Sequence, residues 1–301
     1  MYEQIASNKR KTVVLLLVGI AFLVVIGSVL GYLMNAGPWG AVIALVVATV
    51  LSVVSYFNGD KLVLASTRAR AVTPEEEPRL HNVVEGLAIA AGIPKPRVYV
   101  VPEQAPNAFA TGRDPEHSSI AVTQGLLASL NRVELEGVIG HELSHILDRD
   151  ILVGTVVATV VGAAVLLSEF FMRSWFWGGF RGRRDDNSSG GPLAIVLLVV
   201  GLLMLIVAPI AGQIIKMSVS RNREFLADAQ GAMLTRYPPG LIAALGKIAA
   251  SPTSMHAANN ATAHLWLNQP SRIEGDKMGS LEKLFSTHPT IEERIRRLRE
   301  M

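Results

Sequence analysis

The stretch VIGHELSHILDRD, from Val138 to Asp150, holds two histidines four residues apart, with a glutamate directly after the first. In a helix, His141 and His145 lie one turn apart on the same face, so both imidazoles can reach one metal ion. Glu142 is rotated by about 100° from His141, where its carboxylate can face a water bound to that metal. The alternative is a polar helix face that happens to contain histidine. Because the chain has only seven histidines in 301 residues, chance gives on the order of 0.01 occurrences of HExxH, which favours the metal site.

A catalytic zinc takes three protein ligands and one water, so the two histidines need a partner. The segment SRNREFLADA, from Ser220 to Ala229, offers Glu224 and Asp228 at positions i and i+4 of a predicted helix. Glu224 can bind the metal while Asp228 accepts the free N–H of a liganding histidine and so fixes its tautomer. The competing interpretation is an ordinary acidic helix face. The presence of HExxH in the same chain, which requires a third ligand, argues against it.

The composition limits which side chains can bind a metal and which partners the protein can have. The chain has no cysteine, which excludes thiolate ligands, a cysteine nucleophile and disulfides, so a tightly held metal must use imidazole and carboxylate. Together with a peptide-hydrolysing pattern, this predicts one Zn²⁺ per chain. The formal charge of +3 and the lack of a basic run interleaved with aromatics argue against a nucleic-acid partner.

Long uncharged runs predict a multi-pass membrane protein in contact with the lipid bilayer. No charged side chain lies between Thr12 and Asn58, and the glycine/proline break from Met34 to Gly40 divides this run into two. Each half is long enough to cross a hydrocarbon layer of about 30 Å as a helix, and too long for the core of a secretory signal. Two further uncharged runs, Ile151 to Ser168 and Leu193 to Ile215, predict spans three and four.

Basic residues set the expected orientation. Lys9, Arg10 and Lys11 precede the first run, and Lys61, Arg68 and Arg70 follow the second. By the positive-inside rule, the chain after Asn58 and its active site face the cytoplasm, which predicts a protein of the cell (inner) membrane. The loop between spans three and four opposes this orientation, since it contains Arg173, Arg181, Arg183 and Arg184. A hairpin that does not cross the bilayer fully is therefore an open alternative.

The polar regions predict a fold that is mainly α with a small β-sheet (α+β). A threonine cap and a closing glycine in TPEEEPRLHNVVEGLAIAAG indicate a helix from about Pro78 to Ala91. Arg97 to Val101 and Ser118 to Thr123 have the pattern of strands, joined by an irregular segment that contains NAFATG. Asn131, with Glu134 three residues later, is placed to cap the histidine helix.

The same patterns divide the chain into four parts. Residues 1–58 are the two N-terminal transmembrane helices, and 59–150 the first part of a peptidase domain. Residues 151–215 are an apolar hairpin, and 216–301 the second part of that domain, ending in a short amphipathic helix capped by Thr290. If the histidine helix continues into span three, His145 lies about 9 Å above the membrane edge and Glu224 about 14 Å above it, at about 1.5 Å per residue. The hairpin would thus bring both ligand sets to a common level.

HELSH, REFLADA and STHPTIEERI, with two N-terminal spans, resemble the HtpX-like membrane zinc endopeptidases, relatives of the CAAX prenyl proteases. The resemblance covers nearly the whole chain and implies a gluzincin-type fold, with zinc on His141, His145 and Glu224, Glu142 as general base and Asp228 in support. It also implies protein substrates, namely damaged or misfolded membrane proteins cut on the cytoplasmic side, in membrane-protein quality control and the stress response.

Two further sets of residues carry over from the resemblance. The segment corresponding to NAFATG tends to be an edge strand beside the cleft, so Asn107, Ala108 and Phe109 would contact an extended substrate. The alternative for Phe109 is a core position in a hairpin loop. His288 lies at a family motif, where it would polarise the substrate carbonyl or bind the oxyanion; otherwise it is a histidine at the start of a helix.

Other functions fit the residues less well. An intramembrane protease would place HExxH at bilayer depth, where the surrounding charges such as Glu134 and Asp148 would be very costly. A CAAX-type prenyl protease would need to accept a lipidated C-terminus, and four spans enclose less space than the many-span relatives. A non-hydrolytic metal-binding protein or transporter would use the same ligands, but the first two spans contain no charged residue. The sequence does not indicate an oligomeric state.

Overall fold

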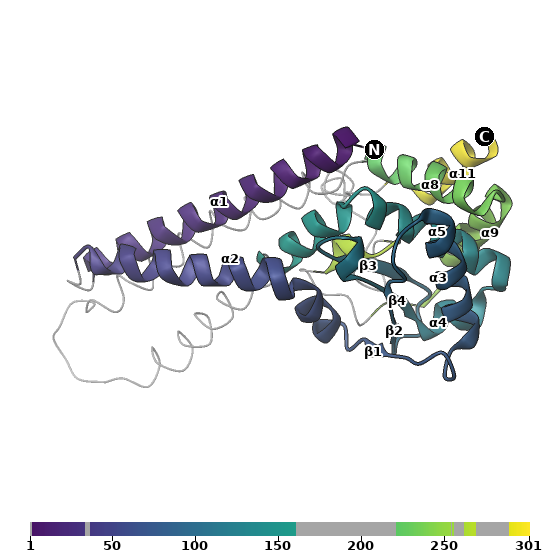
Figure 1. Ribbon diagram of the computed structural model, residues 1–301, viewed down its shortest axis with the longest axis horizontal. Helices are drawn as coiled ribbons and strands as arrows, with labels where there is room; N and C mark the ends of the chain where they lie inside the picture. The colour runs from purple at the N-terminus through teal and green to yellow at the C-terminus, as the bar shows by residue number, and fades with distance from the viewer. Residues whose placement is uncertain (1, 34–36, 161–220, 254, 256–261, 269–288) are drawn as a thin grey trace, which may run out of the picture.

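The computed structural model describes residues 2–33, 37–160, 221–253, 255, 262–268 and 289–301. Two long helices, α1 (Tyr2–Leu33) and α2 (Trp39–Ser66), lie side by side and project from a domain in which helices surround a small sheet (Figure 1). Among the described residues, α2 is the helix whose length and composition fit a membrane span, with a mean hydropathy of 2.3 and only 11% of the span buried. Apolar side chains of α1, including Val13 and Leu17, are exposed as well.

The sheet has four strands in the order β1-β2-β4-β3: β1 (Arg70–Ala71), β2 (Arg97–Val101), β4 (Ser118–Thr123) and β3 (Ala108–Gly112). β2 and β4 are parallel, whereas β1 and β3 run antiparallel to their neighbours. The two strands expected from the sequence have the expected bounds. The NAFATG segment is not irregular, as its pattern indicated, but forms β3 at the edge of the sheet, as the family resemblance implied.

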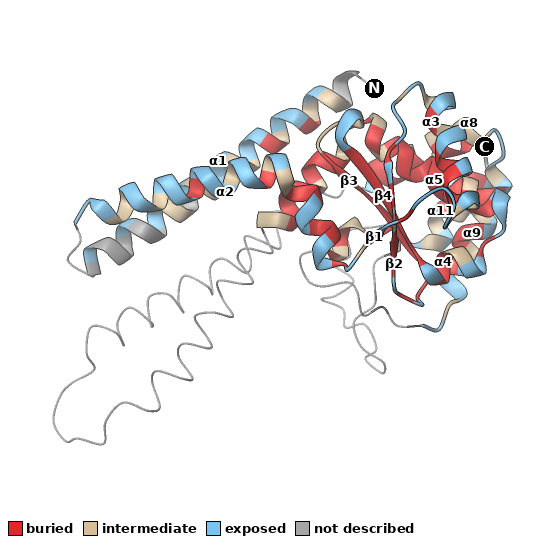
Figure 2. Cartoon of the chain, turned by 60° about the horizontal axis from the view of Figure 1, so that its bottom comes forward, coloured by how far each residue is buried: buried red, intermediate tan, exposed pale blue. Residues whose placement is uncertain are grey.

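Both faces of the sheet are covered, which explains why its strands are mostly buried (Figure 2). Val98, Ile120 and Ala110 belong to the main core, to which α3 (Pro78–Ala91) and α5 (Arg132–Leu147) together contribute eight buried side chains. Ala121 and Phe109 point to the opposite face and pack in a second cluster, which includes apolar residues near the end of α2. The second cluster therefore joins the sheet to the α1–α2 pair.

Helix α3 has the predicted bounds, but its start differs from the prediction. Glu77 precedes the helix and Pro78 is its first residue, while Thr73 hydrogen-bonds within the turn before it. The threonine therefore caps that turn instead of the helix, because proline needs no partner for the N–H it lacks. Gly92 ends the helix in the left-handed conformation, with φ of 68°, as predicted.

Helix α5 carries HELSH and begins at the predicted cap. The Asn131 side chain accepts from the Glu134 N–H at 3.0 Å, and the Glu134 carboxylate accepts from the Asn131 N–H at 2.8 Å. The prediction that α5 continues into span three is wrong. The helix ends at Leu147, and Arg149 has φ of 58°, a left-handed conformation that interrupts an α-helix.

A new helix, Asp150–Val160, follows that break. Several of its apolar side chains, among them Val153 and Val156, are fully buried, so the first part of the third apolar run packs inside the protein. Residues 161–215, with the rest of this run, the arginine-containing loop and the fourth run, lie outside the described residues. The comparison of heights above the membrane rested on a continuous helix and on those runs, and it loses its basis.

The second half of the domain places α8 (Arg221–Thr235) and α9 (Pro238–Ala250) beside α5, and α11 (Ile291–Arg299), capped by Thr290 as predicted, packs against α9 and α8. Short elements complete the described chain: η1 (Pro115–His117), α4 (Gln124–Ser129) and η2 (Ala263–Leu265). α5 and α8 approach closely through glycines: a Cβ added at Gly231 would stand 2.8 Å from the His141 backbone nitrogen, and one at Gly140 would stand 3.1 Å from the Gly231 oxygen. This contact fixes the distance between the two helices that carry the ligands.

Candidate metal centre

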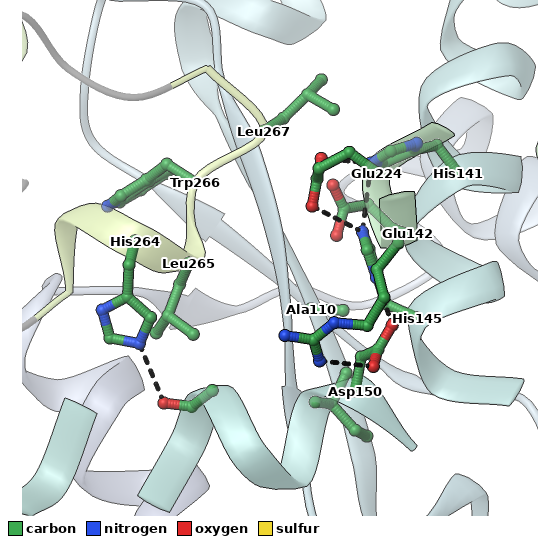
Figure 3. A pocket seen from close by; sticks show the side chains of 13 residues that line it. Ala110, His141, Glu142, His145, Asp150, Glu224, His264, Leu265, Trp266 and Leu267 are labelled. Atoms are coloured by element: carbon green, nitrogen blue, oxygen red, sulfur yellow. Dashed lines mark hydrogen bonds and ion pairs between the residues drawn. The ribbon is translucent and has the colours of Figure 1, made fainter. Parts of the chain in front are cut away.

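His141 and His145 of α5 and Glu224 of α8 converge on one point between the helices (Figure 3). The two Nε2 atoms are 3.2 Å apart; Nε2 of His141 lies 3.7 Å from Oε2 of Glu224, and Nε2 of His145 lies 3.7 Å from Oε1. His141 and Glu224 are buried, and the His145 side chain is 17% exposed. Although 79 residues separate His145 from Glu224 in the sequence, the fold thus brings together the three donors that spacing alone had suggested.

The donor set and its dimensions fit zinc. Nitrogen and oxygen ligands of tetrahedral zinc lie about 2.0–2.1 Å from the ion, which puts the ligand atoms about 3.3 Å from one another. The two Nε2 atoms lie 3.2 Å apart, close to that value, and one atom from each of the three residues lies within 4.8 Å of the other two. Three protein donors leave a fourth position for water, the arrangement of a catalytic rather than a structural site.

Each histidine has its own carboxylate behind it. Asp228 Oδ1 lies 2.9 Å from Nδ1 of His141, as the i and i+4 spacing from Glu224 suggested. Asp150 Oδ2 lies 3.2 Å from Nδ1 of His145, a contact that the sequence reasoning missed. Both carboxylates accept from Nδ1, which leaves both Nε2 lone pairs directed at the same point.

Asp150 is held by residues from distant parts of the chain. Arg223 Nη1 donates to its Oδ1 at 2.7 Å, and the Asn8 side-chain amide of α1 donates to the same atom at 2.6 Å. The same amide donates to the Asp148 carbonyl at 2.9 Å, and Asn8 is only 1% exposed. The first turns of the N-terminal helix therefore contact the carboxylate that supports His145, which no pattern in the sequence indicated.

Arg294 of α11 is the second residue that the sequence reasoning missed. It is 1% exposed, and its guanidinium donates to both Asp228 oxygens, at 2.8 and 2.6 Å. A third bond reaches the Leu267 carbonyl at 3.2 Å, and Nη1 lies 3.9 Å from Glu224. A signal was present: in the apolar stripe that begins at Ile291, the arginine stands at the i+3 position, where a buried residue is expected.

Burial and neighbouring charges set the pKa values around this point. Burial raises the pKa of the Glu142 carboxyl to about 7, although a hydrogen bond with the Ala110 backbone acts to lower it. Burial and the Arg294 charge lower the pKa of His141 to about 4, which keeps this imidazole neutral. Burial would lower the pKa of His145 as well, but the hydrogen bond to Asp150 and the Glu224 charge raise it to about 9. A metal that binds here therefore has to displace a proton from His145.

Glu142 lies where a general base is expected. It is 2% exposed and lines, together with His141, His145 and Glu224, a cavity of about 60 Å³. Figure 3 shows the opposite wall of this cavity, formed by His264, Leu265, Trp266 and Leu267. A carboxyl with a pKa of about 7 can both accept and return a proton near neutral pH.

The remaining predicted site residues are placed as follows. Asn107 and Ala108 lie at the start of the edge strand, with Asn107 3% exposed and Ala108 fully buried. The Phe109 side chain is fully buried on the other face of the sheet, 4.6 Å from the Trp266 ring, in the arrangement of a core residue. His288 lies outside the described residues, so its role is still a prediction.

Comparison with known proteins agrees with this geometry. The model of a family described as "Peptidase family M48" matches residues 74–301. A protein named "Protease HtpX homolog" from Thermoanaerobacter pseudethanolicus is 46% identical to this chain over 302 residues, and the match covers all of this chain and 98% of that protein. One of the same name from Streptococcus agalactiae is 45% identical over 302 residues, and the match covers both chains completely. A solved structure, S. mikatae Ste24p, has a TM-score of 0.50 at 19% identity, covering 99% of this chain and 67% of that one, which shows a likeness of fold alone. Since the family model matches most of the chain and these relatives match its whole length, the chain belongs to peptidase family M48 and is a member of the HtpX protease group.

Proposed function

We propose that the chain is a zinc metalloendopeptidase anchored in the membrane. The observation that carries this proposal is the convergence of His141, His145 and Glu224 beside a buried Glu142. One Zn²⁺ held there would act as a Lewis acid on the substrate carbonyl and lower the pKa of a bound water to about 7. Peptide hydrolysis needs this chemistry and a base, and the base is present.

Within the site, the protein's own residues hold and move protons. Glu142 takes the proton of the attacking water and passes it to the amine that leaves, as its pKa of about 7 allows. Asp228 and Asp150 keep the Nδ1 proton on each histidine, and Arg294 holds Asp228 in place with two hydrogen bonds. We propose His288 as a further group that polarises the carbonyl.

The proposed substrates are damaged or misfolded membrane proteins, cut at the cytoplasmic side of the cell membrane in quality control and the stress response. The arrangement of α1 and α2 supports this side: the start of α1 and the end of α2 both adjoin the peptidase domain, and basic residues lie near both. A multi-pass topology with two more spans within residues 151–215 belongs to the same proposal. The four parts 1–58, 59–150, 151–215 and 216–301 are its working division of the chain.

Substitution of Glu142 tests the proposal. Purified wild type, Glu142→Gln and Glu136→Gln are compared for cleavage of a model membrane protein and for zinc content. Glu136 is the matched control, because it lies on the same helix, is partly exposed and pairs with exposed Arg132. We expect Glu142→Gln to keep its zinc and lose cleavage by at least a hundredfold, while Glu136→Gln keeps both. Equal cleavage by wild type and Glu142→Gln would overturn the proposed function.

A further inference from the structure

The edge strand beside the metal centre is already paired with a peptide, and that peptide belongs to the chain itself. The Leu267 N–H donates to the Ala108 carbonyl of β3 at 2.9 Å. The Asn268 N–H donates to Asn107 Oδ1 at 3.0 Å, and the Asn107 amide donates back to the Asn268 carbonyl at 2.7 Å. The pairing is antiparallel, since the next residue along the segment meets the preceding residue of the strand.

These are the contacts expected of a substrate bound by strand addition. Such a peptide satisfies the backbone groups of an exposed edge and places alternate side chains in pockets. Here Arg294 also donates to the Leu267 carbonyl at 3.2 Å, and the same guanidinium lies 3.9 Å from Glu224. The segment is thus bonded both to the edge strand and to the residue behind the metal ligands.

The segment also fills the space that a substrate would need. Trp266 is fully buried against Phe109, and Leu267 is 3% exposed. The cavity left beside Glu142 and the three donors measures about 60 Å³, whereas ligand sites usually measure about 300–1,000 Å³. An extended peptide does not fit between the metal ligands and β3 while the segment is in place.

We propose that Trp266, Leu267 and Asn268 hold the place of a substrate strand and must leave β3 before an extended peptide can bind. The inference rests on the proposed function, because it assigns the occupant of the same cleft. It also fixes how a substrate lies: antiparallel to β3, with one N–H bonded to the Ala108 carbonyl and the next residue held by the Asn107 amide. At the position of Leu267 the substrate carries an apolar side chain of similar size.

A reversible cross-link tests whether the segment has to move. A Cβ added at Gly154 would stand 2.8 Å from Leu265 Cδ2, so Gly154→Cys and Leu265→Cys bring two thiols close together, and their oxidation is used to tie the residue just before the segment to the helix that begins at Asp150. The chain has no cysteine of its own, so no other thiol competes. Both changes are made in the full chain with Glu142→Gln, so that bound peptide is not cut.

The probe is a labelled synthetic peptide that contains HLWLN, the sequence from His264 to Asn268, and its binding is measured by fluorescence anisotropy. We expect the oxidised protein to bind it at least tenfold more weakly than the same protein after reduction. A peptide with aspartate at the position of Leu267 is the matched control and should bind weakly in both states. Equal affinity of the oxidised and reduced proteins for HLWLN would overturn the inference.

A second measurement needs no cysteine. In the Glu142→Gln protein, the Leu267 amide is protected by its bond to Ala108, and bound peptide should speed its hydrogen exchange, because the segment has left β3. Peptide binding without faster exchange at Leu267 would overturn the inference. These readouts report binding and not hydrolysis, so they are separate from the cleavage comparison whose failure would overturn the proposed function.

Discussion

The side-chain amide of Asn8 donates to Asp150 at 2.6 Å, although the two residues are 142 positions apart in the sequence. Asp150 in turn accepts from Nδ1 of His145, so a residue in the first turns of α1 is two hydrogen bonds away from a metal ligand. Residues that orient a ligand in this way influence metal affinity without contacting the metal. The N-terminal helix is thus joined to the metal centre as well as to α2.

Asn8→Ala is therefore expected to weaken zinc binding. Loss of the amide frees Asp150 to turn away from His145, and changes behind a ligand typically cost about 10–100-fold in metal affinity. We expect zinc affinity to fall by about tenfold, at the lower end of this range, because Arg223 still donates to the Asp150 carboxylate at 2.7 Å. Competition with a chromogenic chelator measures the dissociation constant, and Lys9→Ala, at an exposed neighbouring position, serves as the control. Unchanged zinc affinity in Asn8→Ala would contradict the link.

Arg294→Met tests the buried ion pair. The substitution leaves the Asp228 carboxylate buried without its guanidinium, which typically costs about 3–5 kcal/mol of unfolding free energy. Thermal unfolding of the detergent-solubilised protein should show a clear fall in Tm relative to wild type. Arg296→Met, on the exposed face of the same helix, should have an unfolding free energy within about 0.5 kcal/mol of the wild-type value. If both variants melt alike, the pair does not stabilise the fold as proposed.

Gly231→Ala tests the close contact between α5 and α8. The added methyl would stand 2.8 Å from the His141 backbone nitrogen, so α8 must shift away and carry Glu224 with it. We expect zinc affinity to fall by at least tenfold. Gly246→Ala in α9 is the matched control, because nothing lies within 4 Å of its added Cβ. Replacing a helical glycine by alanine there should stabilise the protein by about 0.5–1 kcal/mol and leave zinc binding unchanged.

The cap of α5 predicts a pH dependence of stability. Burial alone would raise the pKa of Glu134, but hydrogen bonds from Lys247 and from the Asn131 backbone hold it below its ordinary value. Since the folded pKa is lowered, the charged cap stabilises the fold above the ordinary pKa of about 4.3 and loses its effect as pH falls through the folded value. At pH 7 the free energy of unfolding of wild type should exceed that of Glu134→Gln by about 1 kcal/mol. The corresponding difference in Tm should shrink below about pH 4.5. A constant difference across this range would contradict the assignment.

The sequence predicted those parts of the fold that are written in local patterns. The cap of α5, the bounds of α3 and the two strands of the sheet interior follow from periodicity, caps and β-branched residues, and they were confirmed. HExxH and the ExxxD of α8 put five side chains on the right faces of two helices, because the spacing of one helical turn fixes them. Their convergence could be anticipated only from the chemistry that zinc requires.

What the sequence could not predict depends on contacts between distant segments. Asn8 and Arg294 reach the metal centre only through the tertiary arrangement, and neither lies in a metal-binding pattern. The break at Arg149 was missed because no glycine or proline marks it and because the apolar residues after it resemble a membrane span. The Trp266 to Asn268 segment has no local signal of its pairing, since its partner strand lies 159 residues earlier.

The glycine contact between α5 and α8 has a mechanical consequence. Two helices whose backbones touch cannot move closer together, and the densely packed contact between them holds the three donors as one frame. Whatever movement admits a polypeptide into this enzyme must therefore take place in the wall across from the frame. Catalytic geometry and access are assigned to different parts of the molecule, and a variant can change the rate of entry while the coordination sphere stays as it was.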